Sequence, residues 1–186
     1  MLSTEFQNHS RFASQEQIRE IFSECCLEFE WLAYFITGDH STAAACVVDA
    51  CGLSRSHNHL FAEWLLPWAR YATIRSALHT QSARICQLSI KYPQPTCVHD
   101  KHGLLSAELV ELLIAESDSL VNRLDVISRA ALLICGIEKH SVAEAAVMLG
   151  VSSACIRAAY CAGLQVLEVL EYERFSSNHE FAAVYS

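Results

Sequence analysis

The sequence is poor in the residues that form tight turns. Its 186 residues include only six Gly and three Pro, whereas 52% are hydrophobic. An all-β protein needs many turns of the kind that Gly and Pro supply, which argues against that class. Ala, Leu and Glu are abundant, and this composition favours helices. We therefore expect an all-α protein.

Long apolar runs and a secretory leader are also missing. The longest apolar runs, such as "RAALLICGI", are much shorter than the roughly 20 residues that cross a bilayer. No basic segment followed by an apolar one stands at the N-terminus. The nine Cys are scattered and odd in number, which favours reduced thiols over a disulfide framework. These features predict a soluble, cytoplasmic protein with no membrane partner.

The chain lacks the motifs of common catalytic sites. It has no Gly-rich phosphate loop, no motif for a Ser or Cys nucleophile, and no paired carboxylates beyond Glu on helix faces. We expect no enzymatic activity and no cofactor. Cys97, His99 and His102 could supply two or three metal ligands, but no second Cys or His pair lies at zinc-site spacing. No metal site is therefore predicted.

Positive charge is scarce as well. The 13 Lys and Arg are outnumbered by 21 Asp and Glu, and the formal net charge is −8. Binding to nucleic acid draws much of its affinity from Lys and Arg that neutralise phosphates. Any nucleic-acid function must therefore depend on a local basic patch.

Helical spacing of apolar residues recurs along most of the chain, with one interruption. Residues 91–103 hold Pro93 and Pro95 and show no apolar periodicity, which indicates a linker. The expected organisation is two small helical bundles, over residues 14–90 and 104–175, joined by this linker. Helices are expected over 14–37 (one helix or two), 42–51, 60–88 (kinked or beginning at Pro67) and 104–138 (broken near 124–127).

The segment "SVAEAAVMLGVSSACIRAAY", residues 141–160, predicts two short helices around a turn. Ser141 and Glu144 have the spacing of a capping box, which starts a helix. Ala146, Gly150 and Ile156 provide a small residue, a turn residue and a branched apolar residue at the spacing of a helix-turn-helix. A plain helical hairpin within a bundle is the alternative.

A longer segment around this motif, "LDVISRAALLICGIEKHSVAEAAVMLGVSSACIRAAYCAGLQVL", resembles the C-terminal DNA-binding region of bacterial RNA polymerase sigma factors of the extracytoplasmic-function type. In the N-terminal half, "FSECCLEFEWLAYFITGDHSTAAACVVDAC" and "FAEWLLPWARYATIRSAL" are similar to the helices with which these factors bind the polymerase clamp and melt the promoter. The resemblance covers the chain from about Phe22 to Leu167.

The resemblance implies core RNA polymerase and promoter DNA as partners, and an anti-sigma or other protein as a further one. It implies that Ser152, Ser153 and Arg157 open the helix that reads the promoter. It also implies that the segment with Arg70, Tyr71 and Arg75 faces the melting strand, and that Asp49 contacts the polymerase. Arg interleaved with aromatic residues suits stacking on unpaired bases, although burial tendencies favour a core position for Trp64 and Trp68.

The chain departs from typical members of this family at both contact surfaces. Ala44, Ala45 and Val48 stand where the clamp-binding helix usually carries acidic or amide side chains, and Asp49 is the one clear match there. The recognition helix and the segment after it are short of positive charge. From Ser141 to Ser186 the chain has only two basic residues, Arg157 and Arg174, against five acidic ones. The last helix is also expected to present an apolar outer face made of Cys155, Ala158, Ala159, Ala162 and Val166, which would suit contact with another protein. A regulatory or protein-interaction module with little DNA binding is therefore the alternative function.

Overall fold

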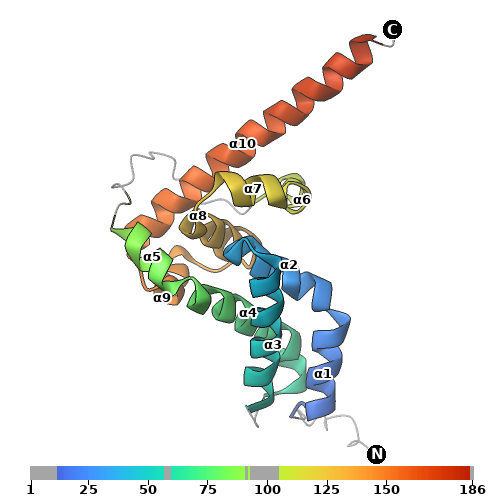
Figure 1. Ribbon diagram of the computed structural model, residues 1–186, viewed down its shortest axis with the longest axis vertical. Coiled ribbons are helices and arrows are strands. Elements are labelled where there is room, and N and C mark those ends of the chain that lie inside the picture. The colour runs from blue at the N-terminus through green and yellow to red at the C-terminus, as the bar shows by residue number, and fades with distance from the viewer. Residues whose placement is uncertain (1–11, 57–59, 91, 93–104, 185–186) are drawn as a thin grey trace, which may run out of the picture. The chain divides into compact units, whose positions relative to one another are not determined.

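The computed structural model describes residues 12–56, 60–90, 92 and 105–184, with side chains described as far as Ser176. In this part of the chain every regular element is helical (Figure 1), and the one pairing of extended backbone is an isolated bridge between Phe12 and Phe61. The prediction of an all-α protein is confirmed.

Contacts between Cα atoms divide the chain into two compact units. The first contains the described residues of Met1–Tyr34 and Asp39–Ala77, and the second those of Phe35–Gly38 and Leu78–Ser186. The predicted linker 91–103 lies outside the described residues except for Tyr92. The domain limits proposed from the sequence therefore remain predictions.

The first unit is built from four α-helices and a short 3-10 turn, although the last residues of α2 and α4 are grouped with the second unit. These are α1 (Gln15–Glu24), α2 (Cys26–Thr37), α3 (His40–Ser56), η1 (Ala62–Trp64) and α4 (Leu65–Thr80). Segment 14–37 thus forms two helices, which is one of the two arrangements that its apolar spacing allowed. Pro67 lies in the first turn of α4, where its missing N–H breaks no hydrogen bond.

The start and end signals of these helices are local. Gly38 adopts a φ of 74° immediately after α2, as expected for a residue that ends a helix. The Asp39 carboxylate accepts a hydrogen bond from the Thr42 amide at 2.7 Å, and this bond caps α3. The helix continues to Ser56, so the sequence-based limit at residue 51 was wrong.

Apolar side chains from all of these helices form the core of the first unit. Helices α1 and α3 lie side by side, as Figure 1 shows, and each contributes fully buried residues. The largest side chains in this core are Ile18, Phe29, Leu32 and Ile74, each at most 1% exposed. Removal of so much apolar surface from water is the main stabilising contribution to such a bundle.

The second unit contains six α-helices and a π-helical segment. These are α5 (Ser82–Ser89), α6 (Ala107–Ala115), α7 (Ser117–Arg123), α8 (Val126–Ala131), the π-helical η2 (Leu132–Ile137), α9 (Val142–Leu149) and α10 (Ser153–Val184). The predicted break near residues 124–127 is confirmed, because Leu124 is extended and Asp125 caps α8. A further break at Glu116 was not predicted.

Helix α8 and η2 form the buried centre of this unit. Their apolar residues from Val126 to Ile134 are inaccessible to solvent, and α10 packs across α8 (Figure 1). Gly163 of α10 allows a close approach, because a Cβ atom at this position would lie 2.6 Å from Cγ of Leu132. Close packing of α10 on η2 therefore depends on the absence of a side chain at residue 163.

Candidate nucleic-acid interface

Helix α9 begins with the capping box that the sequence predicted. The Glu144 amide donates to Oγ of Ser141 at 3.2 Å, and the Ser141 amide donates back to Oε2 of Glu144 at 2.7 Å. The bonds from the Ser141 amide and hydroxyl hold the pKa of the Glu144 carboxyl below its usual range. The carboxylate is therefore ionised at neutral pH, as the cap requires.

A left-handed turn at Gly150 joins α9 to α10. Gly150 has a φ of 67°, in the region that favours glycine. The Val151 amide donates to the Ala146 carbonyl at 3.1 Å, and the Gly150 amide donates to the Val147 carbonyl at 3.3 Å. This pair of bonds is the Schellman arrangement of a helix C-terminus. The predicted turn at Gly150 is confirmed.

The residue after this turn starts α10. Oγ of Ser152 accepts a hydrogen bond from the Cys155 amide at 3.1 Å, so Ser152 occupies the N-cap position. Ala146 of α9 and Ile156 of α10 are both buried, as expected where the two helices pack together. In the first turns of α10 the remaining side chains, those of Ser153, Ala154, Arg157 and Ala158, are half-buried.

Three residues implied as DNA contacts lie at this end of α10. Ser152 is exposed, and its hydroxyl retains a proton to donate because it accepts the cap bond. Ser153 and Arg157 are half-buried and lie one turn apart on the helix. Among the described side chains none forms an ion pair with Arg157. The structure brings these three residues together.

The outer surface expected for α10 differs from the observed one. Cys155 and Ala159 are buried in the core of the second unit, at 6% and 0% exposure, while Ala158, Ala162 and Val166 are half-buried. The expected apolar face was wrong for Cys155 and Ala159, because the side of α10 that meets α8 could not be chosen from spacing alone. On α9, by contrast, Val147 is 82% exposed.

In the first unit, η1 and α4 place aromatic residues along one line. Trp64, Trp68, Tyr71 and Arg75 follow one another at spacings of four, three and four residues, which puts them on one helical face. We call these four residues the aromatic stripe. Trp64 is 61% exposed, so its expected core position was wrong, while Trp68 and Tyr71 are half-buried. Arg75 is exposed at the end of the stripe.

Arg70 lies away from the aromatic stripe. Its guanidinium forms an ion pair with Glu28 of α2, and its side chain is 24% exposed. A residue five positions from Arg75 on an α-helix points about 140° away from it. Tyr71 and Arg75 therefore share a face, whereas the charge of Arg70 is balanced by Glu28 within the same unit.

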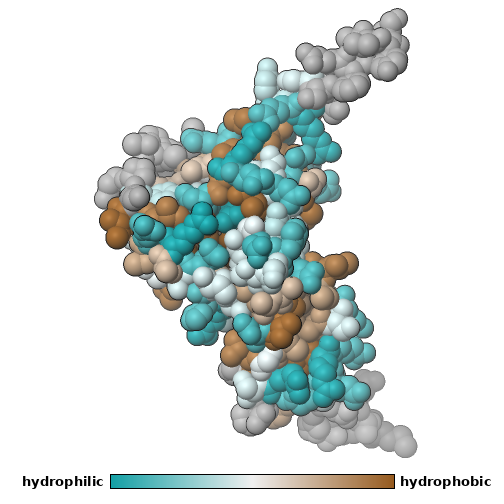
Figure 2. All heavy atoms as spheres, viewed as in Figure 1, coloured by the Kyte–Doolittle hydropathy of each residue, from teal (hydrophilic) through white to brown (hydrophobic). Residues whose placement is uncertain are grey.

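Asp49, the residue implied as a polymerase contact, is exposed on α3. Val48 and Leu53 are exposed on the same helix, and so is Arg55, whose side chain donates to Oε1 of Gln15 at 3.0 Å. Figure 2 shows that apolar atoms at the surface form several separate patches on the visible face of the molecule. The α3 surface is thus one of several places where apolar side chains reach solvent.

Sequence reasoning missed a polar cluster where α8 begins. The Tyr92 hydroxyl donates to Oδ2 of Asp125 at 2.9 Å and lies 2.6 Å from Oγ of Ser128. Burial raises the pKa of the Tyr92 hydroxyl, which stays protonated and able to donate. The Asp-x-x-Ser spacing of Asp125 and Ser128 is an N-cap signal, but no sequence signal pointed to Tyr92.

Neither a metal centre nor a clear membrane span emerges from the described residues. They contain no group of three potential metal ligands, and Cys97, His99 and His102 lie outside them.

Within α10 the segment Ser153–Ser176 is long and apolar enough to cross a bilayer by length and composition. The core helix of a soluble protein has the same properties, and Ile156, Leu167 and Leu170 of this segment are buried.

Comparisons with known proteins give no match. No protein-family model, no curated protein and no solved structure is significantly similar to this chain. The functional interpretation therefore depends on the residues and their geometry.

Proposed function

We propose that the protein is a cytoplasmic, sigma-factor-like transcription initiation factor that binds core RNA polymerase and promoter DNA and has no enzymatic activity. The observation that carries the proposal is the aromatic stripe, with Trp64 exposed at one end and Arg75 at the other. One exposed ring and two half-buried rings on the helical face that carries Arg75 suit single-stranded DNA, since unpaired bases stack on aromatic rings and Arg neutralises phosphate.

The α9–turn–α10 unit supports the same proposal as a helix-turn-helix. Its capped first helix, left-handed Gly150 turn and capped second helix have the order and spacing of that motif. The first turn of α10 would lie against the DNA, with Ser152 and Ser153 offering hydroxyls and Arg157 offering positive charge. Amides at a helix start also attract phosphate.

The exposed surface of α3 is the proposed contact with core RNA polymerase. Asp49 offers one carboxylate there, flanked by the exposed side chains of Val48 and Leu53. Exposed apolar side chains beside a carboxylate fit a protein partner better than nucleic acid. A pull-down of core RNA polymerase by the full chain, repeated with Asp49→Ala, tests this part of the proposal.

The aromatic stripe makes a direct prediction for single-stranded DNA. Replacement Trp64→Ala should weaken binding of a single-stranded promoter fragment by about tenfold, because one base loses its stacking platform. Trp64→Phe should retain most of the affinity. Fluorescence anisotropy of a labelled strand with the full chain measures both.

A matched control comes from another exposed aromatic residue. Tyr172 of α10 is exposed and belongs to the second unit, so Tyr172→Ala should leave the affinity for single-stranded DNA unchanged. Equal affinity of the Trp64→Ala variant and the unchanged chain would contradict the role of the stripe.

Arg157 makes a second prediction, for duplex promoter DNA. Arg157 is nearly the only cation at the start of α10, so the α9–turn–α10 unit should neutralise only about one or two phosphates. The logarithm of its affinity for duplex DNA should therefore fall with the logarithm of the salt concentration at a slope near −1 to −2. In the full chain Arg157→Ala should make the slope shallower by about 1 and weaken binding to all sequences similarly.

Arg174→Ala is the control, because Arg174 is an exposed cation elsewhere on α10. Binding that is indifferent to Arg157, or equally sensitive to Arg174, would place the DNA surface elsewhere.

A second candidate function is a regulatory or protein-interaction module that keeps the helical fold and binds little DNA. The exposed Val147 on α9 and the shortage of cations on α10 favour it. The two candidates differ in a simple measurement. A chain that captures another protein but binds neither single-stranded nor duplex promoter DNA would support the interaction module.

A further inference from the structure

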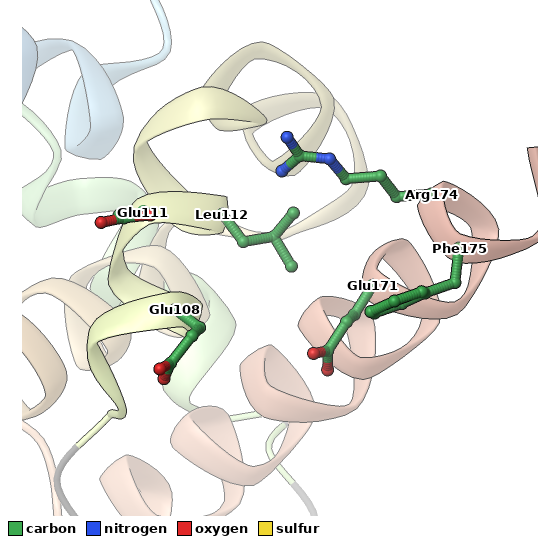
Figure 3. Close-up of a pocket in the computed structure, with 6 residues that line it drawn as sticks. All are labelled: Glu108, Glu111, Leu112, Glu171, Arg174 and Phe175. Atoms are coloured by element: carbon green, nitrogen blue, oxygen red, sulfur yellow. The ribbon is translucent and has the colours of Figure 1, made fainter. Parts of the chain in front are cut away.

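A groove lies between α6 and α10 of the second unit, away from the residues proposed to contact DNA or polymerase. Its volume is about 250 Å³. Six residues line it, and Figure 3 shows them as sticks: Glu108, Glu111, Leu112, Glu171, Arg174 and Phe175.

The middle of the groove is apolar. Leu112 of α6 is buried and points toward α10, while the Phe175 ring extends from α10 toward α6 (Figure 3). Phe175 is 62% exposed. An exposed aromatic ring beside a buried aliphatic side chain leaves room for an apolar side chain of a partner, and such sites often dominate binding energy.

The rim of the groove is mainly acidic. Glu108, Glu111 and Glu171 line the groove against the single guanidinium of Arg174, with the Glu111 carboxylate turned away from α10 in Figure 3. No ion pair between described residues involves any of the four. In the view of Figure 3 the carboxylates of Glu108 and Glu171 lie toward one end, away from Arg174. Hydrogen bonds from its own amide and from Ser106 lower the pKa of Glu108, which keeps it ionised.

We propose that the α6–α10 groove is a docking site for a basic segment of another protein, with a Lys or Arg beside an apolar side chain. The cation would meet Glu108 and Glu171, and the apolar side chain would lie between Leu112 and Phe175. Charge complementarity selects this partner over other classes. Nucleic acid and anionic membranes would be repelled, and a two-fold symmetric dimer through this groove would set the same carboxylates against one another.

The surroundings of the groove strengthen this electrostatic preference. Residues 105–176 contain ten acidic and five basic residues, so the field of the unit attracts positively charged segments. Specificity comes from the groove itself, where the carboxylates of Glu108 and Glu171 lie beside the apolar side chains of Leu112 and Phe175.

Two designed peptides of about 15 residues test the proposal, one with Lys and Leu and the other with Glu replacing every Lys. Titration into the full chain, followed by calorimetry, should show binding of the Lys–Leu peptide at least tenfold tighter than that of the Glu–Leu peptide. Phe175→Ala should weaken it about tenfold. Glu171→Gln should weaken it about two- to fivefold, as for an exposed ion pair.

Glu168→Gln is the matched control, because Glu168 is an exposed carboxylate of α10 that does not line the groove. Its effect should stay below that of Glu171→Gln. Three results would overturn the proposal: no preference for the Lys–Leu peptide, equal effects of the two Glu substitutions, or no effect of Phe175→Ala. A dimer of the full chain that Phe175→Ala dissociates would also overturn it, because a second copy would then occupy the groove.

Discussion

Replacement Gly163→Val should lower the free energy of unfolding of the second unit by about 3 kcal/mol, since it overfills a closely packed contact. The new Cβ would lie 2.6 Å from Cγ and 2.7 Å from Cδ1 of Leu132, whose side chain is fully buried in a close-packed core. Either α10 moves away from η2 or Leu132 leaves its favoured rotamer, and both changes are destabilising.

Gly52 provides a matched control for this substitution. It also lies in a helix, α3, but it is exposed, and a Cβ there would meet no atom within 4 Å. Gly52→Val should therefore change the stability by no more than about 0.5 kcal/mol. Similar losses from the two substitutions would show that helix propensity, and not the contact with Leu132, explains the effect.

The distribution of tryptophan allows the two units to be followed separately. All three tryptophans, Trp31, Trp64 and Trp68, belong to the first unit. In urea unfolding of the full chain, Trp fluorescence therefore reports on the first unit, while far-UV circular dichroism reports on both. Gly163→Val should move the circular-dichroism transition to lower urea more than the fluorescence transition.

Gly150→Val should destabilise the second unit by about 2 kcal/mol for a different reason. A Cβ at Gly150 would meet no atom within 4 Å, so packing does not oppose the substitution. The φ of 67° does oppose it, because a branched residue is strained in the left-handed region. The loss should again appear in circular dichroism more than in Trp fluorescence.

Gly150→Asn separates backbone strain from other effects, because Asn tolerates the left-handed conformation better than Val does. It should recover more than half of the stability lost in Gly150→Val. Equal losses for Asn and Val would mean that the strain of the αL backbone is not the cause.

Local signals in the sequence determined where several helices begin and end. Ser141 and Glu144 satisfy each other's backbone amides, and Gly38 and Gly150 adopt the positive φ that a helix end requires. Each signal acts within about six residues, through hydrogen bonds and backbone sterics that hardly depend on the rest of the fold. For this reason the Gly150 turn and the break before α8 could be predicted, whereas the all-α class followed from the scarcity of Gly and Pro and the abundance of helix-favouring residues.

Only the tertiary structure decided which faces of those helices reach solvent. Spacing placed Trp64, Trp68 and Tyr71 on one face but did not show that Trp64 is exposed. It also could not show that Glu28, 42 positions earlier in the chain, pairs with Arg70, or that Cys155 and Ala159 lie in the core.

The same holds for the contacts that join distant segments of the second unit. The approach of Gly163 to Leu132, the bond from Tyr92 to Asp125 and the groove between α6 and α10 all bring together residues far apart in the sequence. The physical reason is that helical periodicity determines which residues share a face of one helix. The partner of that face depends on how all the helices together bury their apolar surface.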